Sequence, residues 1–214
     1  MKSAWKVLWL IPISTVMFGI SGCDSVLQAL GLQIEDTVAE SESSDTANGL
    51  VGAQSLTVRG NRNILENQTT GIELTLPDTW SKASGLHGSA ELQAADTEQE
   101  LYLIVVAEAD ESLRQFTLRD NAERYRTLLI SRLQNNGEFS SEIPTNLSFL
   151  GEEDYFANQS EIRGVLGDGT PVVYLHTTVV TETRHYQIVA WTTPEQYAAY
   201  ESELQGIIRT FSES

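Results

Sequence analysis

Apolar residues alternate with polar ones along several short stretches of residues 56–214. In "GIELTLP" (71–77), three aliphatic residues alternate with polar ones, which predicts a half-buried strand ending at Pro77. The run "ELYLIVVAE" (100–108) is almost wholly apolar and predicts a central strand covered on both faces. Similar short runs predict strands in "SAELQAAD" (89–96), "TNLSFLG" (145–151), "YFANQSEIRGVL" (155–166), "VVYLHTTVV" (172–180) and "HYQIVAW" (185–191).

Two longer stretches have apolar residues three or four positions apart, which predicts helices. Residues 117–137 open with Thr117 and Asp120 at capping-box spacing and close at Gly137. Residues 193–211 begin with Thr193 as N-cap and a proline at the first helical position. The order of strands, helix, strands and helix favours an α+β domain in which helices pack on an antiparallel sheet. Within it, Asp168-Gly169 marks a hairpin turn between two of the later strands.

The N-terminus has a different pattern, typical of an export signal. Two lysines precede 14 residues without a charge, a run that is short for a membrane span. The sequence Ile20-Ser21-Gly22-Cys23 then resembles the lipobox of bacterial lipoproteins. That resemblance implies cleavage after residue 22 and acylation of Cys23, with several acyl chains giving a stable membrane anchor. The alternative is a buried structural cysteine beside an ordinary signal or membrane anchor.

Composition divides the chain into three parts. Residues 1–22 are the predicted signal peptide, residues 23–55 a lipidated, acidic and flexible tether, and residues 56–214 one globular domain. The formal charge is −17, and residues 23–214 carry 11 basic and 30 acidic groups. So acidic a chain repels nucleic acid, and we expect no nucleic acid partner. We expect a domain on the extracytoplasmic face, attached through lipid on Cys23.

Several runs of the globular part resemble bacterial DcrB-like lipoproteins: "LPDTW" (76–80), "AELQAAD" (90–96), "ELYLIVVAE" (100–108), "FTLRDNAERYR" (116–126) and the terminal "IIRTF" (207–211). These proteins share a fold with PsbP, the extrinsic subunit of photosystem II, and with a Ran-binding nuclear import factor. The resemblance covers roughly residues 64–212 and implies an α/β/α sandwich with a central, mainly antiparallel sheet flanked by helices. The better-known relatives are binding or assembly proteins, and the family supplies no catalytic residue to place here.

The histidines do not form a metal site in the predicted topology. His176 and His185 lie on consecutive predicted strands, where the expected register pairs His185 with Val180 and His176 with Val189. The two imidazoles are then about 13 Å apart along the sheet. Zinc bound to both would need bonds of about 2 Å, so a shared metal is excluded. We expect structural roles for these two and for His87, and no metal or cofactor.

No recognisable catalytic motif is present elsewhere in the sequence. The carboxylate clusters Glu108-Ala-Asp110-Glu111 and Glu152-Glu153-Asp154 lack the calcium-loop pattern and are interpreted as solvated turns. The sequence contains no G-x-S-x-G elbow, and lipidation of Cys23 would remove the single thiol. The sequence therefore predicts a protein that is not an enzyme.

Aromatic residues give the one indication of a binding surface. Trp80, Trp191 and Tyr186 lie on or beside predicted strands, where they would line a groove or simply pack in the core. We expect a non-enzymatic, membrane-anchored lipoprotein that binds an envelope protein or assists its assembly. The alternative is an extracytoplasmic module that binds a small ligand.

Overall fold

The computed structural model describes residues 54–108, 116–151 and 153–214. The predicted signal peptide, Cys23 and nearly all of the predicted tether lie outside these residues. Asp110, Glu111 and Glu152, from the two carboxylate clusters, lie outside them as well. In the part that is described, no helix is long and apolar enough to cross a membrane.

The larger of two sheets has eight antiparallel strands in the order β4-β5-β6-β11-β10-β9-β7, with β8 also paired to β9. Its strands are β4 (Ser81–Lys82), β5 (Leu92–Asp96), β6 (Leu101–Ala107), β7 (Gly137–Pro144), β8 (Phe149–Leu150), β9 (Tyr155–Leu166), β10 (Pro171–Val180) and β11 (His185–Thr192). The smaller sheet has the order β1-β2-β3-β12. Its strands are β1 (Gln54–Arg59), β2 (Arg62–Asn67), β3 (Ile72–Leu76) and β12 (Ser212–Glu213).

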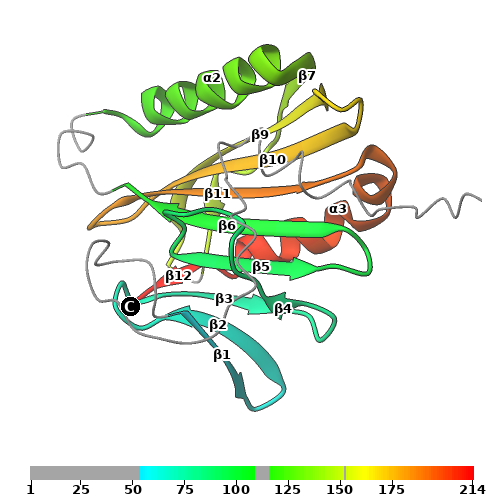
Figure 1. Cartoon of the computed structure of the whole chain (residues 1–214). Helices are drawn as coiled ribbons and strands as arrows, with labels where there is room; N and C mark the ends of the chain where they lie inside the picture. The colour runs from blue at the N-terminus through cyan, green and yellow to red at the C-terminus, as the bar shows by residue number, and fades with distance from the viewer. Residues whose placement is uncertain (1–53, 109–115, 152) are drawn as a thin grey trace, which may run out of the picture.

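Side chains of the larger sheet alternate between two separate apolar clusters, because successive residues of a strand point to opposite faces. On β6, for example, Leu103 belongs to one cluster and Ile104 to the other. Helix α3 (Pro194–Arg209) and the smaller sheet cover the first face, and helix α2 (Leu118–Asn136) covers the second. Figure 1 shows α2 at one side of the larger sheet and the smaller sheet at the opposite side.

Both helices begin where the sequence predicts. Thr117 caps α2 because its side chain accepts a hydrogen bond from the Asp120 backbone, and the Asp120 carboxylate accepts one from the Thr117 backbone N–H. Thr193 accepts from the backbone of Gln196 at the start of α3. Helix α2 ends at Gly137, which is also the first residue of β7. A Cβ at this position would lie 2.0 Å from the Val165 carbonyl oxygen, so only glycine allows so close an approach.

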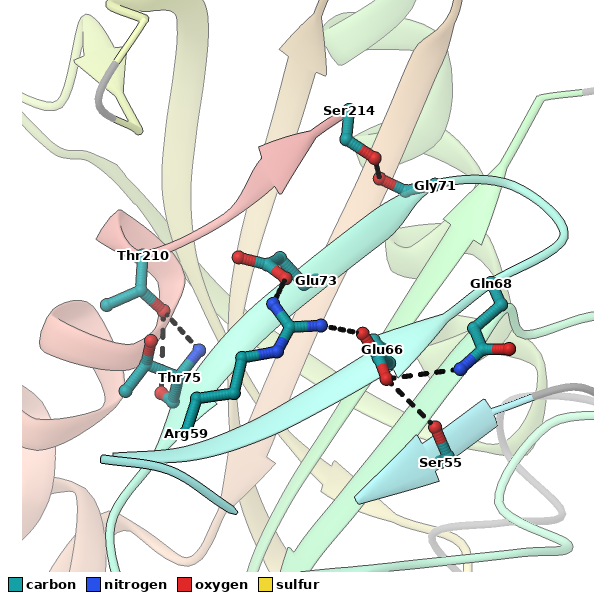
Figure 2. Close-up of polar contacts among 9 residues, drawn as sticks. All are labelled: Ser55, Arg59, Glu66, Gln68, Gly71, Glu73, Thr75, Thr210 and Ser214. Carbon is teal, nitrogen blue, oxygen red and sulfur yellow. Dashed lines mark hydrogen bonds and ion pairs between the residues drawn. The ribbon is translucent and has the colours of Figure 1, made fainter. Parts of the chain in front are cut away.

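Polar contacts connect the strands of the smaller sheet on the face shown in Figure 2. Arg59 on β1 forms ion pairs with Glu66 on β2 and with Glu73 on β3. At the other edge, β12 pairs with β3, and the Ser214 hydroxyl donates to the Gly71 carbonyl at 3.0 Å. The end of the described chain therefore completes a sheet that begins near residue 54.

Most predicted strands are present, including 155–166 with the predicted bounds. The predicted hairpin is also present: β9 pairs with β10 across the turn that contains Asp168-Gly169. The predicted strand 145–151 is shorter than expected, because only Phe149–Leu150 pairs. The expected architecture of one central sheet between helices needs a correction. The smaller sheet shares one face of the larger sheet with α3, so the domain is an α+β fold richer in sheet than predicted.

Candidate functional site beside helix α2

The three aromatic residues predicted to line a binding surface are core residues. Trp80, Trp191 and Tyr186 are each at most 2% exposed. The Trp80 indole donates to Glu203 at 2.8 Å, and the Trp191 ring stacks on Tyr102 at a centroid distance of 5.5 Å. Trp80 and Tyr186 lie in the cluster under α3, and Trp191 in the one under α2. These three side chains therefore do not form the predicted aromatic surface, because their rings are buried in the two apolar clusters of the larger sheet.

The strand register confirms the predicted separation of two histidines. His176 pairs with Val189 and His185 pairs with Val180. His87 lies in a loop, half-buried, where its Nδ1 accepts from the Ser89 backbone at 3.1 Å and burial lowers its pKa. Among the residues with described positions, no three His, Cys, Asp or Glu side chains gather as a metal site would require.

His176 instead belongs to a buried polar layer between the sheet and the first half of α2. Its Nε2 lies 2.7 Å from Gln187 Oε1 on the neighbouring strand, so this nitrogen carries the proton. Thr178 donates to the same oxygen at 2.7 Å, and the Gln187 amide nitrogen donates to Glu108 at the end of β6. The ring of Tyr125 on α2 stacks over His176 at 6.2 Å. Burial lowers the His176 pKa to about 4, so this imidazole is neutral at physiological pH.

Some polar atoms in this region have no hydrogen-bond partner within the described chain. Asn121, on the first turn of α2, is buried with both amide atoms unpaired, and Glu108 Oε2 is also unpaired. Burial and the nearby Glu108 carboxylate raise the pKa of Tyr125. Unpaired buried polar groups are unfavourable, so this half of α2 is held less firmly than an apolar contact would hold it.

Arg126 connects α2 to two strands of the sheet. Its Nε lies 2.8 Å from Glu142 Oε1 on β7, and its Nη1 donates to Asn158 Oδ1 on β9 at 2.8 Å. Ser160, also on β9, donates to the same Glu142 oxygen at 3.2 Å. These contacts fix the start of α2 over the edge of the larger sheet.

A cavity of about 620 Å³ opens where the start of α2 meets this edge. We call it the α2 cleft, and its lining comes from α2, its N-cap and the ends of two strands: Thr117, Leu118, Arg119, Arg126, Pro144 and Asn158. The volume is within the range of ordinary ligand pockets, which is roughly 300–1,000 Å³. The cleft is therefore large enough for a drug-sized molecule or for a side chain of a partner protein.

An exposed aromatic pair lies at the rim of the α2 cleft. Phe149 on β8 and Phe156 on β9 are paired across the strands, with ring centroids 5.2 Å apart. They are 48% and 61% exposed, which is unusual for so large an apolar side chain. Phe156 is two residues from Asn158 on the same strand, so both point to the face covered by α2, about 7 Å apart. On the helix side of the cleft, the exposed Phe116 lies under Arg124 at 5.9 Å.

The sequence predicts the strands that carry Phe149 and Phe156 but not that these rings are exposed. A strand pattern assigns residues to two faces, and both faces of β9 contain apolar residues. Phe156 is exposed because α2 does not extend over this end of β9. The helix covers Ile162, farther along the same strand. Helix placement, which the local pattern does not contain, therefore decides where the rim lies.

Comparisons with known proteins add information about the fold. No protein-family model matches this sequence, and no curated protein matches it. The solution structure of PsbP from Synechocystis sp. PCC 6803 is similar, with a TM-score of 0.52 and 15% identity over 79% of this chain and 98% of that protein. PA94 of Pseudomonas aeruginosa, of unknown function, and LpqN of Mycobacterium tuberculosis, involved in cell envelope biogenesis, each have a TM-score of 0.42 and 13% identity. They cover 76% and 66% of this chain, and 99% and 82% of their own chains. The domain has a PsbP-like fold.

Proposed function

We propose that this protein is a membrane-tethered lipoprotein of the DcrB-like group that binds an envelope protein and catalyses no reaction. Cys23 carries the acyl anchor, residues 23–55 give reach, and the domain at 56–214 carries recognition on the extracytoplasmic face. The observation that carries the binding function is the exposed Phe149–Phe156 pair at the rim of the α2 cleft.

An exposed aromatic pair beside a cavity is typical of a protein interface. Aromatic side chains are enriched in interface cores, because each ring removes a large apolar area from water at a low cost in side-chain entropy. Scattered apolar side chains on a surface are common, but the rings of Phe149 and Phe156 contact each other in a tilted pair, and Phe156 is two residues from Asn158 of the cavity lining. A partner that covers both rings would remove more apolar area from water than a partner that covers either ring alone.

The chemistry of the polar layer favours binding over catalysis. His176 and Gln187 are buried under α2, and each is hydrogen-bonded to a neighbour. A general base must reach a substrate proton, and the His176 imidazole, including its unprotonated Nδ1, is buried under α2. The layer therefore acts in our proposal as support for α2, which forms one wall of the α2 cleft.

The volume of the α2 cleft favours a second candidate, a module that binds a small extracytoplasmic ligand. At about 620 Å³ the cavity has room for such a molecule. The two candidates differ in what the rim does. A small ligand would fill the cavity and leave Phe156 in water, whereas a protein would cover that ring.

Photo-crosslinking in intact cells of the source bacterium tests the proposal. A photoreactive phenylalanine analogue replaces Phe156 in one strain and Val58 in another, in the full chain. Val58 is a matched control, because it is 72% exposed and apolar but lies on β1 in the other sheet. We expect links from position 156 to one envelope protein and none from position 58. The absence of a protein product from position 156, together with ligand-dependent changes in thermal melting, would favour the small-ligand candidate.

The lipid anchor needs a separate test. We expect the wild-type chain to begin at an acylated Cys23 and to fractionate with membranes, and Cys23→Ser to be released from them. Mass spectrometry that finds Met1 retained and Cys23 unmodified would contradict the anchor without affecting the binding site.

A further inference from the structure

Helix α2 is the basic element of an acidic domain. It carries four arginines and two carboxylates, whereas the other described residues carry 6 Lys or Arg and 19 Asp or Glu. Three of these arginines lie in its first half, and two of them, Arg119 and Arg126, line the α2 cleft. The charge at the α2 cleft therefore differs from that of the rest of the domain.

Of Asp120, Glu123 and Glu142, carboxylates of the described residues that lie beside residues lining the α2 cleft, two already have partners. Asp120 forms the capping box with Thr117, and Glu142 is paired with Arg126. Glu123 is exposed on α2, one residue from the exposed Arg124. Arg119 is exposed, and no ion pair within the described part of the chain involves it. As far as the described residues are concerned, the Arg119 guanidinium at the edge of the cavity is thus available to a partner.

We infer that the α2 cleft binds an acidic peptide segment of the partner, with an apolar side chain entering the cavity and a carboxylate meeting Arg119. This inference rests on the proposed function, because it names the chemistry of the partner at the same site. The Phe149–Phe156 pair packs against the apolar part of the segment. Arginine suits this contact, because its planar guanidinium binds a carboxylate through two parallel hydrogen bonds.

A narrow segment fits this charge pattern better than an anionic membrane does. At physiological ionic strength, charges act over about 8 Å, so a peptide in the α2 cleft meets mainly the local arginines. A membrane is a broad surface and would also meet the acidic residues around them. Phenylalanine and arginine together also suit membrane interfaces, so phospholipid vesicles belong in the test.

The peptide is expected to bind through side chains, not by adding a strand to the sheet. The edge strand beside the cleft, β7, has an irregular register between Phe139 and Ser141 and ends in Pro144. A bulge twists an edge strand, and a proline removes a backbone donor, so both features disfavour strand addition. Recognition is therefore assigned to the arginine, the cavity and the aromatic pair.

Fluorescence anisotropy with labelled synthetic peptides tests the inference. The full chain, purified in detergent, is titrated with a 12-residue peptide containing glutamate, phenylalanine and leucine. Two matched peptides replace every glutamate by glutamine or every apolar residue by serine. We expect the first peptide to bind at least fivefold more tightly than either variant, with its affinity falling as salt rises. Equal binding of the glutamine peptide would overturn the inference.

Charge reversal locates the contact. Arg119→Glu should weaken binding of the acidic peptide about fivefold or more, since it replaces an attraction with a repulsion. Arg62→Glu is the matched control, an exposed arginine on β2 in the other sheet, and should change affinity less than twofold. Equal losses in both variants would contradict a local contact. Vesicle binding that requires Phe156 and exceeds peptide binding would assign the rim to the membrane.

The crosslinking experiment and the peptide titration test the proposed function and the partner chemistry independently of each other. Crosslinks from position 156 to a protein, without a preference for the acidic peptide, would keep the proposed function and overturn the partner chemistry. Loss of the crosslinks in cells, with acidic peptides still bound selectively, would keep the chemistry of the α2 cleft and overturn the envelope partner.

Discussion

Helices α3 and α2 cover opposite faces of the same sheet, but the two contacts are built differently. The contact under α3 is mainly apolar and includes the smaller sheet, with Phe211 between the rings of Tyr155 and Tyr186. Its buried polar pair, Gln159 and Thr177, is joined by a hydrogen bond of 2.9 Å. Under α2, Leu129 and Leu133 pack on the sheet only in the second half of the helix. The first half lies on the polar layer.

The difference separates stability from recognition. The face under α3 has the larger of the two apolar clusters and so supplies more of the stabilisation. The face under α2 can therefore contain a cavity and exposed rings near the start of the helix, because the stability of the fold does not depend on burying that region. Four substitutions or conditions test this separation, from the largest expected effect to the smallest.

The largest effect is expected from Phe211→Ala in the apolar contact. This fully buried ring touches two others, so its removal should lower the free energy of unfolding by about 3–5 kcal/mol. Urea denaturation followed by circular dichroism measures the change. Leu129→Ala under α2 is the comparison, with an expected loss of about 2 kcal/mol. A larger loss for Leu129→Ala would reverse the assignment of stability to the α3 face.

Acid should weaken the α2 contact through His176. Its pKa falls from 6.5 to about 4 in the folded protein because burial disfavours the charged imidazole. Between these two pH values the His176 imidazole binds a proton in the unfolded chain but not in the folded one. The free energy of unfolding therefore falls as the pH falls. The loss should reach about 3 kcal/mol at pH 4. In His176→Gln this part of the pH dependence should vanish. Parallel pH profiles for the two proteins would contradict the assignment.

Replacing Asn121 by leucine should stabilise the protein slightly. The amide of Asn121 is buried and has no hydrogen-bond partner among the described residues, so an apolar side chain of similar size removes an unfavourable burial. We expect Asn121→Leu to raise the free energy of unfolding by about 1 kcal/mol, seen as a higher urea midpoint at unchanged slope. A lower midpoint would mean that the amide is paired in solution, for example with water.

The smallest effect on stability is expected at the rim. Phe156→Ser should change the free energy of unfolding by less than about 0.5 kcal/mol, because the ring is 61% exposed. The same variant should lose binding of the acidic peptide. Ile162→Ser is the control on the same face of the same strand, where full burial predicts a loss of several kcal/mol. Strong destabilisation by Phe156→Ser would show that the rim is structural.

Local sequence signals predict the helices and the strands on either side of them. The capping box at Thr117 and Asp120, the N-cap at Thr193 and the turn at Asp168-Gly169 each depend on a few neighbouring residues. The register of His176 and His185 follows from the turn between their strands. These features could be predicted because their causes are near in the sequence.

The missed elements depend on distant partners. Strand β12 forms only because β3 lies beside it, and β7 is a polar edge strand without a regular apolar pattern. The α2 cleft combines α2 with the ends of β7 and β9, and the exposure of Phe156 depends on where α2 begins. The aromatic residues chosen from the sequence are buried, because a pattern of residue types does not say which side of a strand is left uncovered.

The pairing of β12 with β3 also sets an order for folding. The Thr210 hydroxyl accepts from the Thr75 backbone across 135 residues, and a Cβ at Gly71 would lie 2.6 Å from the Ser214 carbonyl oxygen. Closing so long a loop costs entropy before the contact is formed, so the smaller sheet is completed late. A chain emerging N-terminus first would hold Leu65 and Leu74 uncovered until α3 and β12 arrived. During that interval the unfinished smaller sheet has uncovered apolar residues and is open to aggregation and proteolysis.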